Sequence, residues 1–434
     1  MRKRFVFAMS AAVVFLTAMS LIFSGCPENV VGPEEDEDET EIPGGQDKGA
    51  RTYKPNKNGK RVWHTVWYEP EEDPRQTMGY RLDNDEQTPL FDHVVMLYGL
   101  RLVVQDCSKQ PWECNVDGLH ACVLGNMAYY LNNVETYFKP LQDNGQKVLL
   151  SLVPASGRAG HGMAVQSLFN WPHEATNRWE SWAGGREYPA NEEATYRLID
   201  QIADIFMAAN IDGIGYDEEY GGDIQLVNPN TGASQAVSVY GGTGSDNFLR
   251  FAYELNQEMR RRGRTEDLIQ EVYETKLSLR PTATFKDRRT GQQVTVKRED
   301  VITFSFDASY GGAARSSAIG MPASRFGPSS IALADVAGSA PKPPPGRSGN
   351  AGIVNRMSNV LRQNNGVVMY YCLRSRAEIE QGIENWGIGA WPKNTYGTTD
   401  GTKPETYLSE ITETLHDVRT IYVGDDYARR FKSQ

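Results

Sequence analysis

The chain has 434 residues, of which 39% are hydrophobic and 23% are charged, and its formal net charge is −11. This hydrophobic content supplies a large core and excludes disorder of the whole chain. The acidity argues against a nucleic-acid partner, because nucleic-acid-binding surfaces are rich in Lys and Arg. Much of the negative charge is local, since seven of the eight residues in 34–41 are acidic.

Residues 1–26 have the organisation of an export signal. A basic start, Met1–Arg4, precedes an apolar stretch over 5–23, and small residues then lead to Cys26. This length and these flanks are typical of a signal peptide rather than of a membrane-spanning helix. Bacterial lipoproteins carry their lipid on a cysteine directly after small residues, so we expect Cys26 to be lipidated. The alternative is a plain cleaved signal with an incidental cysteine.

Residues 27–60 are polar and rich in Gly, Pro, Glu and Lys, which predicts an acidic flexible tether between the lipid anchor and the folded domain. Their acidic run resembles the export tag of surface-exposed lipoproteins in Bacteroidetes-like bacteria. The expected location is therefore the bacterial outer membrane, facing outward and held only by the lipid, with the periplasm as the alternative. A solvated spacer also explains the charge, and the two interpretations are compatible.

From Val62 onward, apolar strands alternate with amphipathic helices. Strands are expected at 62–68, 91–100, 147–153, 211–219, 275–279, 301–306, 330–333 and 366–373. Helices are expected at 131–144, 192–210, 246–262 and 406–422. The alternation predicts a parallel sheet covered on both faces, and eight strands predict a single α/β domain over 61–434, a (β/α)8 TIM barrel. An open doubly wound sheet is the alternative, although no Gly-x-Gly-x-x-Gly follows the first strand.

The strand expected at 211–219 carries the clearest chemistry. Side chains alternate along a strand, so one face carries Gly215, Asp217 and Glu219 and the other carries Ile214, Tyr216 and Glu218. The apolar face packs on helices, which directs two carboxylates into the barrel at its C-terminal end, where barrel enzymes keep their active sites. Two carboxylates are costly to bury without a function. A salt-bridged or solvated loop acid is the alternative.

The run Asp212-Gly-Ile-Gly-Tyr-Asp-Glu-Glu219 resembles Asp-Gly-x-Asp-x-Asp-x-Glu, the signature of glycoside hydrolase family 18. Its Asp-Glu-Glu-Tyr ending is similar to the secreted bacterial endo-β-N-acetylglucosaminidases rather than to typical chitinases. Other segments resemble strands of those enzymes in the same order, namely Lys147–Val153, Phe306–Gly311 and Gly366–Leu373. The resemblance covers most of residues 62–422.

The resemblance implies a retaining mechanism without an enzyme nucleophile. Glu219 would protonate the glycosidic oxygen and later activate water, while the substrate's own 2-acetamido oxygen attacks the anomeric carbon. Asp217 would hold the acetamido N–H and stabilise the oxazolinium ion. Tyr371 and Tyr310 are candidates to hydrogen-bond the acetamido group or the water, with aromatic packing at strand ends as the alternative. No cofactor is implied.

Four further residues are candidates for substrate binding. Asp307 stands where the family carries an Asn, and Glu69 follows the first strand. Trp171 and Trp386 lie in long segments after the third and eighth strands, where exposed aromatic rings can stack on sugar faces. The alternative for both tryptophans is anchoring of these loops against the barrel.

The sequence departs from the signature at Gly215, where the family carries its middle Asp. In the family that carboxylate pairs with the following Asp and shares its proton. Asp217 lacks this like-charged neighbour, so its pKa and orientation are expected to differ from those in the family. The reaction rate and pH optimum of this chain are then expected to differ as well. Glu218 lies on the opposite strand face and does not replace the missing group directly.

Three functions are consistent with these observations. The leading hypothesis is an endo-β-N-acetylglucosaminidase that cleaves the β-1,4 bond of the N,N'-diacetylchitobiose core of N-linked glycans. The second is a chitinase on GlcNAc polymers, and the third is a non-catalytic, surface glycan-binding lipoprotein on the same scaffold. The expected partners are N-linked glycans or glycoproteins, and the chain is expected to be a monomer.

The remaining cysteines suggest a disulfide rather than a metal site. Outside the reducing cytoplasm, Cys107 and Cys114 can close a small loop. Zinc held by His120 and Cys122 is the competing interpretation, but the spacing fits no standard zinc pattern, so we expect no metal. Cys372 lies in an apolar strand and is expected to be a core residue.

Overall fold

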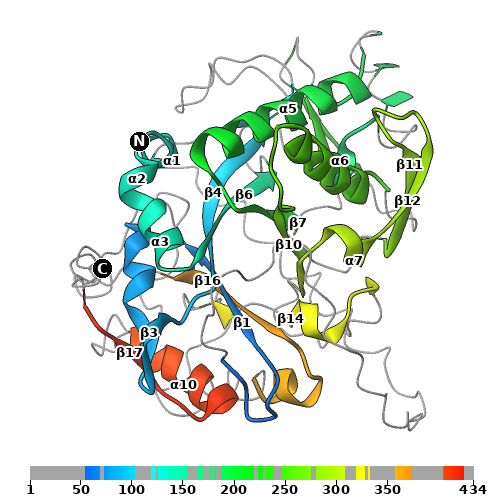
Figure 1. Cartoon of the computed structure of the whole chain (residues 1–434). Helices are drawn as coiled ribbons and strands as arrows, with labels where there is room; N and C mark the ends of the chain where they lie inside the picture. Colours follow the sequence, from blue (N-terminus) through cyan, green and yellow to red (C-terminus); the bar gives the residue numbers. More distant parts are fainter. Residues whose placement is uncertain are drawn as a thin grey trace, which may run out of the picture. The chain divides into compact units, whose positions relative to one another are not determined.

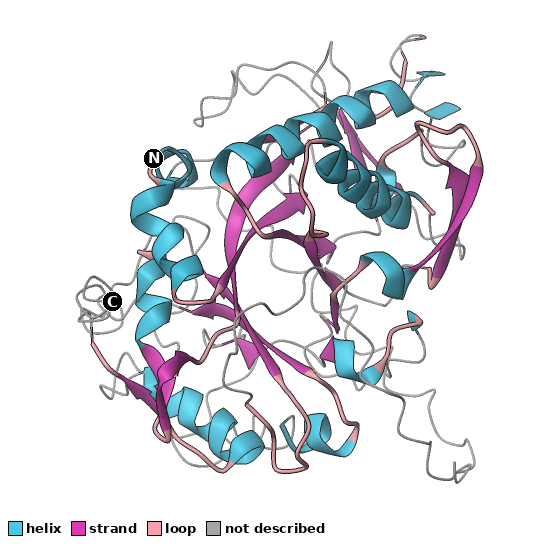
Figure 2. Cartoon of the chain, viewed as in Figure 1, coloured by secondary structure: helices cyan, strands magenta, loops and turns pink. Residues whose placement is uncertain are grey.

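Parallel strands form the centre of the computed structural model (Figures 1 and 2). Their order is β14-β13-β10-β7-β6-β4-β1-β16-β15, and each neighbouring pair is parallel. The strands are β1 (Trp63–Tyr68), β4 (His93–Val103), β6 (Lys147–Pro154), β7 (Gly213–Glu218), β10 (Ile269–Glu274), β13 (Phe304–Asp307), β14 (Phe326–Gly327), β15 (Ile331–Ala332) and β16 (Val367–Leu373).

The structure describes part of the chain, all of it within the unit Ile42–Gln434. The described residues are 54–68, 73–103, 119–123, 126–154, 165–170, 176–177, 180–181, 185, 187–218, 223–227, 231, 233–238, 246–274, 280–307, 319–327, 331–332, 357–373 and 404–424. Within these residues, no helix combines the length and the hydropathy needed to cross a bilayer.

The strand order closes almost completely on itself. Strand β14 pairs with β13, and β15, which follows within a few residues, pairs with β16. These two short strands therefore share the seventh position between the sixth strand and the eighth. The result is a nearly closed, eight-position parallel barrel, so the (β/α)8 prediction is confirmed and the open doubly wound alternative is wrong.

The barrel separates two apolar clusters. Inside it lie side chains from alternate strand positions, including Trp67, Val95, Leu149, Tyr273, Phe306 and Met369. Outside it, Ile214 and Tyr216 of β7 belong to the larger cluster shared with the helices. Tyr216 packs edge-on against Phe248 of α6, with the ring centroids 5.0 Å apart. The alternation expected for 211–219 thus matches the side of the barrel that each residue faces.

Helices cover the outer surface of the strands (Figure 1). The longest are α5 (Glu192–Ala209), α6 (Asn247–Arg261) and α10 (Pro404–His416), accompanied by α1 (Asn126–Asn132), α2 (Val134–Tyr137), α3 (Lys139–Asp143), α7 (Arg298–Val301) and the 3-10 turns η1 (Pro74–Gly79), η3 (Val165–Ser167) and η5 (Ala323–Arg325). Asn191 caps the start of α5, since its side chain accepts the Ala194 N–H, and Asn210 caps the end in the left-handed conformation.

Several short antiparallel strands decorate the barrel. These are β5 (His120–Cys122) on β4, the sheet of β2 (Tyr80–Leu82), β3 (Asp85–Pro89) and β17 (Thr420–Tyr422), and the hairpins of β8 (Asp223–Val227) with β9 (Ser234–Ser238) and β11 (Thr282–Lys286) with β12 (Gln293–Lys297). The helix expected over 406–422 ends earlier than predicted, because α10 stops at His416 and Thr420–Tyr422 form strand β17. Asp417 has a φ of 63° directly after α10, and the chain then turns to pair with β2.

Two other expected elements differ from the structure. The helix expected at 131–144 is divided into α1, α2 and α3, because Asn133 leaves the helical conformation and Pro140 has no N–H to continue the ladder. The fifth barrel strand is β10, at 269–274, whereas the expected strand at 275–279 lies outside the described residues. Polar Gln270 and Glu271 interrupt the apolar run that would have marked β10.

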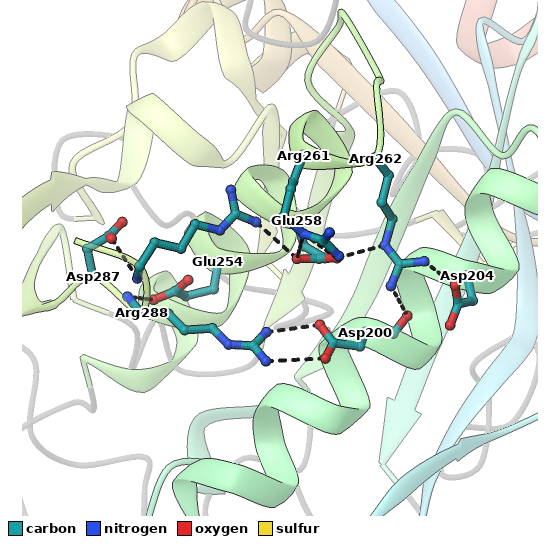
Figure 3. A network of polar contacts seen from close by, with 9 residues as sticks. Asp200, Asp204, Glu254, Glu258, Arg261, Arg262, Asp287 and Arg288 are labelled. Carbon is teal, nitrogen blue, oxygen red and sulfur yellow. Dashed lines mark hydrogen bonds and ion pairs between the residues drawn. The ribbon is translucent and has the colours of Figure 1, made fainter. Parts of the chain in front are cut away.

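A charged network fastens the β11–β12 hairpin to the outer helices (Figure 3). The carboxylate of Glu258, on α6, pairs with Arg261, Arg262 and Arg289. Burial raises the pKa of Glu258, but hydrogen bonds from Arg261 and Arg262 outweigh this and lower it to about 2. Arg288 reaches Asp200 of α5 with contacts of 2.9 and 3.2 Å. These ion pairs attach the turn of the hairpin to both α5 and α6.

Candidate active site

Strand β7 brings a carboxylate to the C-terminal end of the barrel interior. Asp217 is only 7% exposed and follows Gly215 on the inner face of the strand. In the neighbouring strand, its register partner is Tyr273, a member of the interior cluster. A buried carboxylate at this end of a barrel strand is in the location where barrel enzymes perform chemistry.

The other candidate residues contribute less to the described geometry. Asp307 ends β13 and is paired with Glu274, the last residue of β10, while Tyr371 of β16 is paired with Trp67. The parallel arrangement places these positions toward the same end of the barrel as Asp217. Only the backbone of Asp307 and Tyr371 is described. The remaining candidates lie outside the described residues, namely Glu219, Tyr310, Glu69, Trp171, Trp386 and Cys26.

The space beside Gly215 is already filled. A Cβ atom on this residue would lie 2.8 Å from Cγ1 of Val95 and 3.1 Å from Cζ2 of Trp67. Trp67 is fully buried, and its ring centroid lies 5.8 Å from that of Tyr273. The missing carboxylate of the signature has therefore been replaced by apolar packing from β1 and β4. Only a residue without a side chain fits at 215 while Trp67 and Val95 keep their positions.

The neighbouring acid of the same strand has a structural contact. Glu218 points to the outer side of the barrel and is 2% exposed. Its Oε1 accepts a hydrogen bond from the backbone N–H of Val165, at 3.0 Å. This bond ties the end of β7 to η3, in the segment that follows β6. Glu218 thus positions a loop outside the barrel.

Asp212, the first acid of the signature, lies at the opposite end of the strand. Its Oδ2 accepts hydrogen bonds of 2.9 Å from the backbone N–H of Val148 and from Nε2 of Gln142. Lys147 approaches its other oxygen at 3.5 Å. These contacts fix the beginnings of β6 and β7 against each other. The role of Asp212 is therefore to align the two strands, far along β7 from Asp217.

The barrel interior also contains an ionisable pair that the sequence did not reveal. His93 Nδ1 lies 2.5 Å from Oε1 of Glu271, and the hydroxyl of Thr65 donates to the same oxygen at 3.1 Å. Glu271 is 0% exposed and His93 is 2% exposed. The only signal in the sequence is the polar interruption at Glu271 itself, because its partner is 178 residues away.

The cysteine-rich region gives no support for zinc. Cys122 is disulfide-bonded to a cysteine whose side chain lies outside the described residues. A disulfide sulfur is not the thiolate that zinc requires, so Cys122 in this state is not a zinc ligand. The pair expected from the sequence, Cys107 with Cys114, lies outside the described residues. In the described ranges, no three His, Cys, Asp or Glu side chains are grouped to hold a metal ion.

These features define an α/β barrel with a buried acid at the C-terminal end of its fourth strand. No protein-family model matches the sequence, and no curated protein matches it either. Solved structures with a similar chain course include endo-β-N-acetylglucosaminidases and chitinases of glycoside hydrolase family 18.

Three of these structures illustrate the range of similarity. EndoBT-3987 of Bacteroides thetaiotamicron, with a Man5GlcNAc product, is 15% identical, with 83% of this chain and 62% of that chain covered and a TM-score of 0.44. A fungal endo-β-N-acetylglucosaminidase of family 18 is 11% identical, with 82% and 98% covered and a TM-score of 0.40. A family 18 chitinase from Pseudoalteromonas aurantia is 16% identical, with 72% and 94% covered and a TM-score of 0.36. The chain thus spans less than two thirds of the first structure.

Proposed function

We propose that this chain is a glycoside hydrolase of family 18 type that cleaves within the N,N'-diacetylchitobiose core of N-linked glycans. The observation that carries the proposal is the position of Asp217, buried on the inner face of the fourth barrel strand at its C-terminal end. The sequence after it, Glu218-Glu219-Tyr220, completes the signature that the strand begins at Asp212. The position of the residue in the fold agrees with its position in the motif.

In this proposal, each carboxylate has a separate task. Glu219 donates its proton to the glycosidic oxygen, the 2-acetamido oxygen of the substrate attacks the anomeric carbon, and the bond to the leaving sugar breaks. Asp217 accepts the acetamido N–H and stabilises the positive charge of the oxazolinium ion. Glu219, now ionised, takes a proton from a water molecule. The oxygen of this water attacks the anomeric carbon and opens the oxazolinium ring, so that the configuration is retained overall. The apolar walls of Trp67 and Tyr273 strengthen the electrostatic effect of Asp217.

The test is to replace each carboxylate by its amide. We expect Glu219→Gln to lower glycan release from a glycoprotein by at least about 100-fold and Asp217→Asn by a similar factor, because each removes a group that acts in the transition state. Glu193→Gln, an exposed acid on α5, is the matched control and should leave release unchanged. Unchanged turnover in Glu219→Gln would contradict the proposal, provided that circular dichroism shows a folded protein.

Two alternatives use the same barrel. Chitinase activity predicts cleavage of GlcNAc polymers in preference to N-glycans, so both substrates are offered to the same preparation. Glycan binding without cleavage is favoured by one observation, the apolar packing at Gly215 in place of the middle carboxylate. Micromolar glycan binding with no product at any pH between 4 and 9 would support this third function. Mass spectrometry of the products distinguishes the two hydrolases, and glycan binding without any product identifies the third function.

The proposal includes a location and an assembly state. We propose that Cys26 carries the lipid that anchors the chain to the bacterial outer membrane, that the segment between Cys26 and the buried Lys54 is the tether, and that the folded domain is monomeric. Incorporation of a labelled fatty acid that is lost in Cys26→Ala would support the anchor. Light scattering after size-exclusion chromatography gives the molecular mass of the domain, and a dimer would contradict the monomer.

A further inference from the structure

The pair of Glu271 and His93 lies in the middle of the barrel, below Asp217. Glu271 is in register with Gly215 of β7 on one side and with Phe304 of β13 on the other. Asp217 is two residues further along β7, on the same inner face. With strands about 4.8 Å apart and about 6.7 Å between residues on one face, the Cα atoms of Asp217 and Glu271 are about 8 Å apart. The two acids are therefore neighbours in one interior.

The pair is enclosed on the side away from Asp217. The ring of His93 lies 5.5 Å from both Trp63 and Phe304, and these two rings are 5.7 Å apart. Thr65, which binds the same carboxylate oxygen, is paired with His93 in the β1–β4 register. The carboxylate of Glu271 thus crosses the interior from β10 to β1 and β4. Aromatic rings shield it from solvent at the N-terminal end of the barrel.

Several polar atoms in the strand row of Gly215 and beside it are unpaired within the described residues. Three buried atoms have no hydrogen-bond partner in the described part of the chain, namely Oε2 of Glu271, Oγ of Ser151 and Nε1 of Trp67. Ser151, Gly215 and Glu271 occupy one row across β6, β7 and β10, and Trp67 packs over Gly215. Each buried polar group left without a partner costs about 1–3 kcal/mol. Stability alone does not explain three of them in one place.

A purely structural role also fits poorly with the energetics of burial. Replacing a buried ion pair by apolar side chains of similar volume is often neutral or stabilising, since the desolvation cost can exceed the attraction between the charges. The surrounding interior is otherwise apolar and aromatic. It includes Val95 and Leu149, which are paired with each other, and Ile269, which is paired with Gly213. An apolar residue at 271 would suit this core. The presence of a carboxyl group there is therefore better explained by a function than by stability.

We infer that Glu271, held by His93 and Thr65, is a positioning residue that acts through Asp217. It supplies a buried carboxylate beneath Asp217 from the neighbouring strand, on the row where β7 itself has only Gly215. Its field and its free oxygen restrict the orientation of the Asp217 carboxylate toward the barrel mouth. His93 and Thr65 contact Glu271 directly, Ser151 and Gly215 lie in its strand row, and Asp217 is two residues further along β7. This inference rests on the proposed function for its effect on turnover, but not for its effect on Asp217 itself.

The kinetic test is a double-mutant cycle. We expect Glu271→Gln, which keeps the shape and removes the charge, to lower kcat about 10-fold with little change in KM, a coupling within the range found for groups in one network. In an Asp217→Asn background, the same substitution should have almost no further effect. Glu258→Gln, a buried acid outside the barrel, is the matched control and should not couple with Asp217. An equal loss of kcat in both backgrounds would overturn the inference.

A second measurement does not depend on turnover. The infrared difference between the wild-type protein and Asp217→Asn isolates the carboxyl bands of Asp217. We expect these bands to shift in Glu271→Gln and to stay in place in Glu258→Gln. If the bands are unchanged in Glu271→Gln, the inference fails even when the enzyme is active. If the wild-type protein cleaves no glycan but the bands shift, the proposed function fails and the inference stands.

Discussion

Two groups of buried ionisable side chains differ in how many of their polar atoms have a hydrogen-bond partner. The outer cluster consists of Lys54, His64, Asp92, Tyr370 and His416, at the outside of the barrel. The inner pair is Glu271 with His93. In the outer cluster every polar atom has a partner, whereas one oxygen of Glu271 has none among the described residues.

The outer cluster is a continuous chain of hydrogen bonds. Lys54 Nζ donates to Asp92 Oδ1 at 3.1 Å and to the Leu90 carbonyl at 2.9 Å, and Asp92 Oδ2 accepts the His64 backbone N–H at 2.8 Å. Burial raises the pKa of Asp92, but the Lys54 ammonium, the His64 ring and backbone N–H, and the His93 ring together lower it to about 2. Residues 54–56, which the sequence assigns to the tether, are in this way packed on the barrel, with Lys54 and Asn56 buried.

The comparison separates architecture from candidate chemistry. A fully paired cluster has no polar atom left to bind a ligand. Its hydrogen bonds connect Pro55 and His416, the last residue of α10, to His64 of β1 and Tyr370 of β16. The inner pair lies one strand row before Asp217, and Oε2 of Glu271 has no partner among the described residues. Predictions for the outer cluster therefore concern stability, and those for the inner pair concern activity.

The largest effect on stability is expected for Lys54→Met. It leaves the buried Asp92 carboxylate without its cation, which costs about 3–5 kcal/mol for a pair of this kind. Lys57→Met is the matched control, because the pair of Lys57 with Asp417 is exposed and such pairs contribute about 0–1 kcal/mol. Urea unfolding monitored by tryptophan fluorescence measures both. Equal stability of the two variants would remove the distinction between the clusters.

The next effect concerns the packing between the inner pair and Asp217. Gly215→Ala places a Cβ against Val95 and Trp67, and overpacking of this kind costs about 1–3 kcal/mol. Val95→Ala removes the closest atom, so the double variant should lose less stability than the sum of the two single variants. Strict additivity would show that the methyl group of Val95 does not limit position 215. The same urea titrations provide this comparison.

The sequence predicted the barrel because its strands are apolar runs of regular spacing. It also predicted the inner face of β7, since alternation alone places Gly215 and Asp217 on one side. The pair of Glu271 and His93 could not be predicted from the sequence. Glu271 interrupts the apolar pattern expected for a buried strand at β10, and His93 lies 178 residues away on another strand. The packing at Gly215 depends on three strands meeting, which no local pattern encodes. The role of Glu218 likewise depends on a contact with Val165.

The smallest effect is a pH dependence that arises in the outer cluster. His416 Nδ1 lies 2.8 Å from the Pro55 carbonyl, which can only accept, so Nδ1 carries a proton and Nε2 is the acceptor. His64 Nε2, 2.9 Å away, then donates to it, and Tyr370 donates to His64 Nδ1 at 2.6 Å. Both rings are neutral in this arrangement. Protonation of His416 would place its Nε2–H against the Nε2–H of His64, and protonation of His64 would place an Nδ1–H against the proton that Tyr370 donates.

Burial, together with the neighbouring ring and Lys54, lowers the pKa of His64, and burial also lowers that of His416. The unfolded chain therefore binds more protons below about pH 6.5, and stability should fall as the pH drops from 7.5 to 5.5. The slope is at most about 1.4 kcal/mol per pH unit for each histidine. His416→Asn keeps a donor for Pro55 but does not titrate, so its slope should be smaller. An unchanged slope would place the pH dependence outside this cluster, because the lowered pKa of Asp92 acts only below about pH 4.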